Sequence, residues 1–200
     1  MMLEPREQRE ATWPRVIALI RAEIAQVIEA GAQDVQLDAP HIAMGLVDGQ
    51  WETTKAVAMI SAIFAGIRGV TRSVHLCYGD FDARTWTRNR QFGPLLPTIQ
   101  ALAGTVDRVV LEFSLPEQWA QRALLRAIPE EIKVATGIVD VKAARIETPA
   151  EIREKAEELL RSVPAERLLL CPSCGFGRRD GDLAIGKATA MVQAAQAIRA

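Results

Sequence analysis

Five short strand-like segments alternate with helix-like segments along the 200 residues of this chain. The predicted strands cover residues 34–38, 74–78, 108–113, 133–139 and 167–171. The predicted helices cover residues 7–30, 53–65, 94–103, 116–127, 149–162 and 182–199. Helices that return the chain between strands are typical of parallel pairing. The alternation therefore predicts an α/β fold built from parallel (β/α) units.

Polar side chains gather where the predicted strands end. In chain order they are Asp38, His75 with Cys77, Glu112, Asp140 and Cys174. In a (β/α) barrel of the TIM type, active-site residues come from the carboxyl ends of several strands. A closed barrel of that type has about eight strands. The five strands found here therefore predict a partial barrel.

The composition describes a globular chain, which we expect to form a single domain over residues 1–200. The formal net charge is −1, and 49% of the residues are hydrophobic. Without a basic excess, no nucleic-acid partner is expected. No apolar run is long enough for a membrane span, and the charged N-terminal residues do not resemble a secretion signal, so we expect a cytoplasmic protein that binds no membrane.

His75 and Cys77 are candidate metal ligands. Side chains two residues apart on a strand point to the same face, so these two can reach one ion. An imidazole with thiolates suits zinc, and a catalytic zinc site with two cysteines and one histidine keeps one position open for substrate. Taken alone, a histidine such as His75 is more often an ordinary core or surface residue than a metal ligand. The zinc interpretation therefore requires a second cysteine from elsewhere in the chain.

Two further cysteines, Cys171 and Cys174, could supply that ligand. Their C-x-x-C spacing also occurs in redox pairs, which is an alternative. Cys171 continues the apolar run of residues 168–170 and fits the role of a small core residue. An odd number of cysteines in a chain without a secretion signal argues against a disulfide framework.

Several short motifs follow one another in a specific order along the chain. They are Gln36-Leu37-Asp38-Ala39-Pro40, His75-Leu76-Cys77, Glu112, Gly137-Ile138-Val139-Asp140 and Pro172-Ser173-Cys174-Gly175. In order and separation this set resembles the C-terminal catalytic barrel of the cobalamin-independent methionine synthase family. The likeness extends over nearly the whole chain. It implies that residues 1–200 form the C-terminal portion of such a barrel.

The resemblance implies a site and an activity. The implied ligands of a Zn²⁺ ion are His75, Cys77, Glu112 and Cys174. Glu112 would be the most exchangeable of them. The implied reaction is transfer of a methyl or alkyl group from a donor to a thiol such as homocysteine, because a metal-bound thiol is deprotonated and nucleophilic. Catalytic candidates are Asp38, Asp140 and Lys142, and Asp38 would bind the amino group of the substrate.

Two residues depart from the family's pattern. Ala39 stands where the family has a glutamate, and Lys142 stands where it has a histidine linked to proton handling. The sequence around Lys142 is more similar to short single-barrel relatives such as the epoxyalkane:coenzyme M transferases. A related zinc-dependent thiol alkyltransferase or lyase with another donor or acceptor is therefore a second hypothesis. Asp140 and Lys142 could also form a structural ion pair.

Five strands taken from a barrel leave two open edges and an uncovered face. We therefore expect a homo-oligomer or a second subunit that completes the barrel, unless the strands rearrange into an open doubly wound sheet. A non-catalytic subunit that only supports a partner chain is a third hypothesis. Four arginines could bind an anionic substrate, although solvated surface charge is the more common role of such residues: Arg88, Arg90, Arg178 and Arg179.

Overall fold

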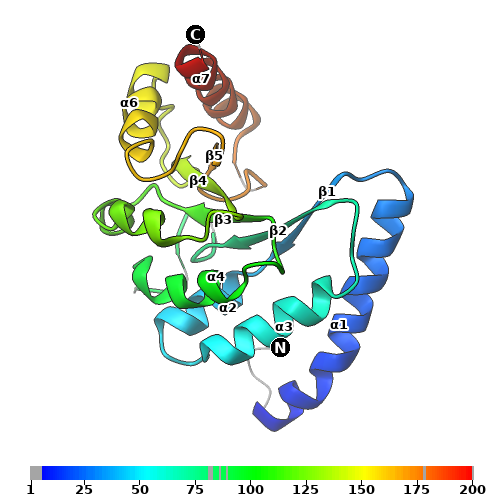
Figure 1. The fold of residues 1–200 in the computed structure, drawn as a ribbon. Helices are drawn as coiled ribbons and strands as arrows, with labels where there is room; N and C mark the ends of the chain where they lie inside the picture. Colours follow the sequence, from blue (N-terminus) through cyan, green and yellow to red (C-terminus); the bar gives the residue numbers. More distant parts are fainter. Residues whose placement is uncertain (1–5, 81–82, 86, 89, 178, 200) are drawn as a thin grey trace.

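The computed structural model describes residues 6–80, 83–85, 87–88, 90–177 and 179–199. It confirms the predicted α/β fold with five parallel strands, which lie side by side in chain order (Figure 1). The strands are β1 (Asp34–Asp38), β2 (Thr71–Leu76), β3 (Arg108–Glu112), β4 (Lys133–Val139) and β5 (Leu168–Pro172). A doubly wound sheet reverses its strand order at a switch point. This sheet has no such reversal, so the partial-barrel prediction holds and the doubly wound alternative is wrong.

In Figure 1, α1 and α3 lie towards one end of this sheet and α6 and α7 towards the other. The α-helices are α1 (Arg6–Glu29), α2 (Pro40–Val47), α3 (Thr53–Phe64), α4 (Leu96–Ala101), α5 (Pro116–Trp119), α6 (Pro149–Leu159) and α7 (Gly181–Arg199). Two 3₁₀ helices, η1 (Gly93–Leu95) and η2 (Arg122–Ala127), precede α4 and follow α5. No helix among the described residues is both long enough and apolar enough to cross a membrane.

Two helical segments differ from the prediction. Helix α2 was not predicted, because nearly every side of its eight residues is buried and no polar face marks it as a helix. The predicted helix over residues 116–127 is divided into α5 and η2. The division lies near Gln121, whose side-chain oxygen accepts the backbone N–H of Gly93 at 2.7 Å. A tertiary hydrogen bond therefore holds the chain where helical propensity alone would continue the helix.

Only one face of the sheet packs on the hydrophobic core. Val74 and Leu76 on β2, and Val109 and Leu111 on β3, belong to the hydrophobic core formed with the helices. Because side chains alternate along a strand, His75, which lies between two of these core residues, points to the opposite face. The register pairs His75 with Asp38 and with Val110. The polar residues at the strand ends therefore share one face and one edge of the sheet.

Strands β4 and β5 approach each other closely at Gly137. Their register shifts there, since Gly137 pairs with Cys171 but Val139 pairs with Pro172. A Cβ atom on Gly137 would lie 2.6 Å from the Cα of Ser173 and 2.9 Å from the carbonyl oxygen of Pro172. Such contacts are too short for any side chain. Glycine at this position lets the turn after β5 lie against the end of β4.

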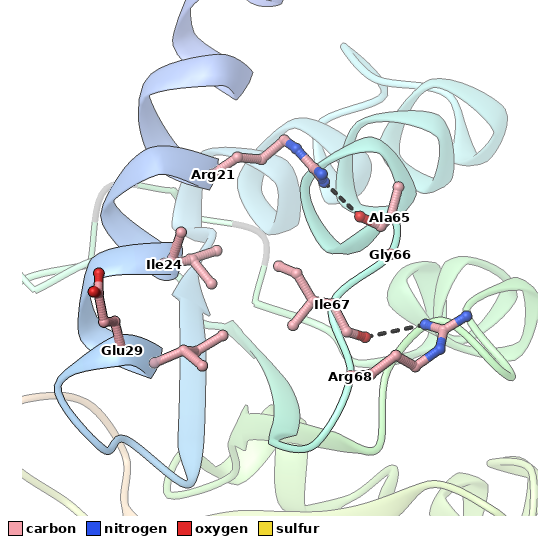
Figure 2. A pocket seen from close by; sticks show the side chains of 9 residues that line it. Arg21, Ile24, Glu29, Ala65, Gly66, Ile67 and Arg68 are labelled. Carbon is pink, nitrogen blue, oxygen red and sulfur yellow. Dashed lines mark hydrogen bonds between the residues drawn. The ribbon is translucent and has the colours of Figure 1, made fainter.

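At the other end of the strands, where β1 and β2 begin, a cavity lies between α1 and the segment after α3 (Figure 2). Arg21 on α1 donates hydrogen bonds to the carbonyls of Ala62, Ile63 and Ala65 at 3.0, 2.9 and 2.8 Å. The last carbonyls of a helix lack partners within it, so Arg21 satisfies the end of α3. The cavity beside it has a volume of about 420 Å³ and is lined partly by Ile24 and Ile67. These segments lead into the amino ends of β1 and β2, where a barrel's residues serve stability.

Candidate metal centre

Three potential metal ligands meet at the carboxyl edge of the sheet. His75 lies on β2, Cys77 follows that strand directly, and Cys174 lies in the turn after β5. Their ligand atoms all lie within 4.8 Å of one another. The sulfur atoms of Cys77 and Cys174 are 3.9 Å apart, although the two residues are separated by 97 positions in the chain. The fold therefore assembles a group of one imidazole and two thiols.

The chemistry of these residues fits a zinc ion. His75 is only 6% exposed. Neither of its ring nitrogens has a hydrogen-bond partner among the described residues. A buried polar atom without a partner is unusual and costly. A metal ion would satisfy one nitrogen, and one histidine with two cysteines is a ligand set of catalytic zinc sites.

The two thiols affect each other's protonation. Their hydrogen bond lowers the pKa of Cys174 and raises the pKa of Cys77, which burial raises further. The backbone N–H of Gly175 also helps to lower the pKa of Cys174. A thiolate, not a thiol, is the form that binds a metal. Cys174 is therefore the sulfur that is ionised first.

A buried ion pair fixes the two cysteine-bearing loops relative to each other. Arg179, five residues after Cys174, donates a hydrogen bond from Nη2 to Asp80 at 2.6 Å. Both side chains are 8% exposed. Arg179 Nε also donates to the carbonyl of Val141 at 2.5 Å. The sequence analysis did not predict this pair. The signal for it was the presence of opposite charges, Asp80 and Arg179, shortly after Cys77 and Cys174.

Glu112 and Lys142 form a second buried ion pair beside the cysteines. Lys142 Nζ lies 2.8 Å from Glu112 Oε1, and the side chains are 7% and 0% exposed. Burial raises the pKa of Glu112, and the charge and hydrogen bond of Lys142 oppose that change. Glu112 is not part of the group of three ligands. The suggested ion pair between Asp140 and Lys142 is wrong, since Asp140 accepts the backbone N–H of Lys142 at 2.9 Å and the ammonium bonds to Glu112.

The remaining candidates lie around this centre. The exposed carboxylate of Asp38 has one oxygen 4.0 Å from His75 Nε2. That distance is too long for a hydrogen bond. Cys171 lies outside the ligand group, and burial raises its pKa to about 12. The apolar run around Cys171 and the resemblance to the family favoured Cys174 over Cys171 as the candidate ligand, and Cys174 is the one that lies beside His75 in the structure.

The loop after β4, which carries Asp140 and Lys142, is held by a further buried ion pair. Lys187 on α7 is fully buried, and its Nζ lies 2.7 Å from Glu147 Oε2. The other oxygen of Glu147 accepts the backbone N–H of Asp140 at 2.8 Å. Burial raises the pKa of Glu147, but the bonds from Lys187 and Asp140 outweigh burial, so the pKa is lowered overall. Helix α7 is thereby connected to the candidate site.

Comparison with known proteins identifies the family. Residues 3–197 match the family model described as "Cobalamin-independent synthase, Catalytic domain". The chain belongs to this family. Membership confirms the resemblance inferred from the motifs and places the chain in a family of enzymes. The match extends from α1 into α7, so it includes all five strands of the cobalamin-independent synthase fold described above.

Relatives of this cobalamin-independent synthase domain are longer. A methionine synthase of Saccharolobus islandicus is 25% identical over 182 residues, which are 90% of this chain and 48% of that protein. A 5-methyltetrahydropteroyltriglutamate–homocysteine methyltransferase of Paraburkholderia phytofirmans is 29% identical over an alignment of 201 positions, which covers 97% of this chain and 24% of that protein. The chain therefore spans half or less of the length of these relatives.

A solved structure shows the same fold. It is a B12-independent methionine synthase from Shewanella sp. W3-18-1 in complex with selenomethionine. It matches with a TM-score of 0.81 at 22% identity, and covers 98% of this chain and 57% of that chain. At that identity the likeness shows a shared fold.

Proposed function

We propose that this chain forms part of a zinc-dependent enzyme that transfers a methyl group to a thiol such as homocysteine. The observation that carries the proposal is the meeting of His75, Cys77 and Cys174 within 4.8 Å of one another. These residues would hold the ion. When bound, zinc would keep a thiol substrate in its thiolate form at neutral pH, ready to attack an alkyl carbon. The names of the relatives, methionine synthase and homocysteine methyltransferase, support this substrate class.

The chain's own residues would position the substrate. Asp38 has an exposed carboxylate at the carboxyl edge of β1, close to His75. A carboxylate there could bind the amino group of an amino-acid thiol whose sulfur lies at the ligand group. Asp140 fixes the turn that carries Lys142 through the hydrogen bond to the backbone of Lys142. Asp38 would thus orient the substrate. Asp140 and Lys142 would take part in catalysis next to the sulfur of the substrate, with Asp140 holding the turn that carries Lys142.

An assay of metal content and product tests this function. The reduced, zinc-loaded protein is incubated with homocysteine and 5-methyltetrahydropteroyltriglutamate, and methionine is measured. We expect about one zinc per chain, loss of product after chelation, and recovery when zinc is restored. A carefully reduced sample that binds no zinc would rule out the enzyme interpretation. Zinc without any methyl or alkyl transfer would favour the non-catalytic subunit.

A second candidate function keeps the metal and changes the substrates. Lys142 is bonded to Glu112 inside the site, and Ala39 is buried beside Asp38. Both differ from the motif residues of the methionine synthases, so the substrate side of the site is altered while the ligand group is kept. A zinc-dependent thiol alkyltransferase or lyase with another donor or acceptor fits these residues. Stoichiometric zinc with no methionine from the named donor, but alkylation of other thiols, would favour it.

We further propose that a second subunit or a second copy of the chain covers the open sheet edges. Every residue of β5, including three leucines, is only partly buried, and β1 has three exposed residues. Exposed edge strands of this kind pair with other chains. We expect light scattering after size-exclusion chromatography to show a mass above one chain, or co-purification with a partner. A stable monomer that unfolds cooperatively would contradict this.

A further inference from the structure

The ion pair between Lys142 and Glu112 leaves neither carboxylate oxygen without a partner. Oε1 of Glu112 accepts from Lys142 Nζ at 2.8 Å, and Oε2 accepts from the backbone N–H of Tyr78 at 3.2 Å. Tyr78 directly follows the ligand Cys77 in sequence. Glu112 therefore lies beside the metal site but uses its oxygens to bind the protein.

Lys142 is itself held in place by the turn after β4. Its backbone N–H donates to Asp140 Oδ1 at 2.9 Å, and the preceding N–H, of Val141, donates to Ser173 Oγ at 3.1 Å. Ser173 is fully buried and is the neighbour of Cys174. Because this turn is bonded to the cysteine-bearing turn, the backbone that carries Lys142 is fixed relative to the ligand group.

The charges also oppose a change of partner. If Glu112 turned to a metal, the ammonium of Lys142 would remain buried without a counter-ion. Removing one member of a buried ion pair is strongly destabilising, because the remaining charge is neither solvated nor paired. The metal site gains nothing comparable, since two thiolates already balance the two charges of Zn²⁺. Glu112 is therefore retained by Lys142.

We propose that Lys142 holds Glu112 out of the metal's ligand set, so that His75, Cys77 and Cys174 are the protein's ligands and the fourth position is open. This inference rests on the proposed function, because it takes these three residues as metal ligands. No protein carboxylate then has to leave before a thiol binds. Lys142 is a positioning residue in this arrangement, since it acts on the site through Glu112.

Thiol binding to the cobalt(II)-loaded protein tests the inference, because the visible spectrum of cobalt reports its ligands. We titrate 2-mercaptoethanol into the wild type, Lys142→Met, and the double variant Lys142→Met with Glu112→Gln. Lys142→Met frees Glu112 to compete for the open position, and an internal ligand acts at millimolar effective concentration. We expect thiol affinity to fall by about tenfold or more. The double variant should bind the thiol within about threefold of the wild type.

The comparison of the wild type with the double variant decides the outcome even if Lys142→Met folds poorly. Equal affinities support the inference. Tighter thiol binding by the double variant would show that Glu112 already occupies the metal in the wild type, and would overturn it. Lys142→Arg, which keeps the charge, should retain the wild-type spectrum. A wild type that binds neither cobalt nor zinc would instead refute the proposed function, so the two failures are distinct.

Discussion

Replacing Cys174 with serine is expected to abolish stoichiometric zinc binding. The variant Cys174→Ser removes the sulfur with the lowered pKa and leaves His75 and Cys77 alone at the site. Loss of a residue that merely orients a metal ligand already costs about 10- to 100-fold in affinity, so loss of a ligand should cost more than about 100-fold. Competition with a chromophoric chelator measures the affinity, and elemental analysis measures the metal content.

Cys171→Ser is the matched control, because it makes the same chemical change three positions earlier on the same segment. Cys171 lies outside the ligand group, and its raised pKa keeps it a thiol at neutral pH. The control should keep its zinc. Zinc retained by Cys174→Ser, or lost only from Cys171→Ser, would contradict the assignment of the ligand.

Replacing Lys187 with methionine is expected to cause the largest loss of stability. The variant Lys187→Met leaves the carboxylate of Glu147 buried without its cation, and removes a hydrogen bond to the carbonyl of Arg145. Breaking a buried pair from one side costs about 3–5 kcal/mol of the free energy of unfolding. Unfolding in urea, followed by circular dichroism, measures this loss.

Two variants show whether the buried charge is the cause. Arg153→Met breaks an exposed pair with Glu157 on α6, where the cost should stay below about 0.5 kcal/mol. Adding Glu147→Gln to Lys187→Met removes the stranded charge and should recover part of the lost stability. If Lys187→Met unfolds at the same urea concentration as Arg153→Met, the buried pair of Lys187 and Glu147 does not stabilise the fold as expected.

The fold could be predicted to the level of its strands, because each strand contains apolar residues at strand spacing and is separated from the next strand by a helical segment. The predicted strand over residues 74–78 lies a few residues later than β2, since Cys77 and Tyr78 are apolar but extend beyond the last ladder bonds. Helix α2 could not be found, because five of its eight residues are buried and no periodic pattern remains. Pattern-based prediction fails where all sides of an element are covered.

The site could be predicted in its residue types but not in its pairings. His75, Cys77 and Cys174 could be found because an imidazole and thiolates at strand ends are rare and chemically specific. The partner of Lys142 could not be found, because Glu112 lies 30 positions earlier and meets it only through the turn after β4. Local sequence favoured Asp140, two residues away, whose carboxylate bonds to the backbone instead.

The close approach at Gly137 makes the position of the proposed ligand Cys174 depend on the lack of a Cβ atom at residue 137. Any Cβ on Gly137 would push against the backbone of Pro172 and Ser173, which leads into Cys174. As the sequence evolves, Gly137 can be replaced only if β5 moves away from β4. Such a movement would carry the sulfur of Cys174 away from Cys77. Glycine at position 137 and cysteine at position 174 should therefore be inherited together, as a linked pair whose members share no contact between side chains.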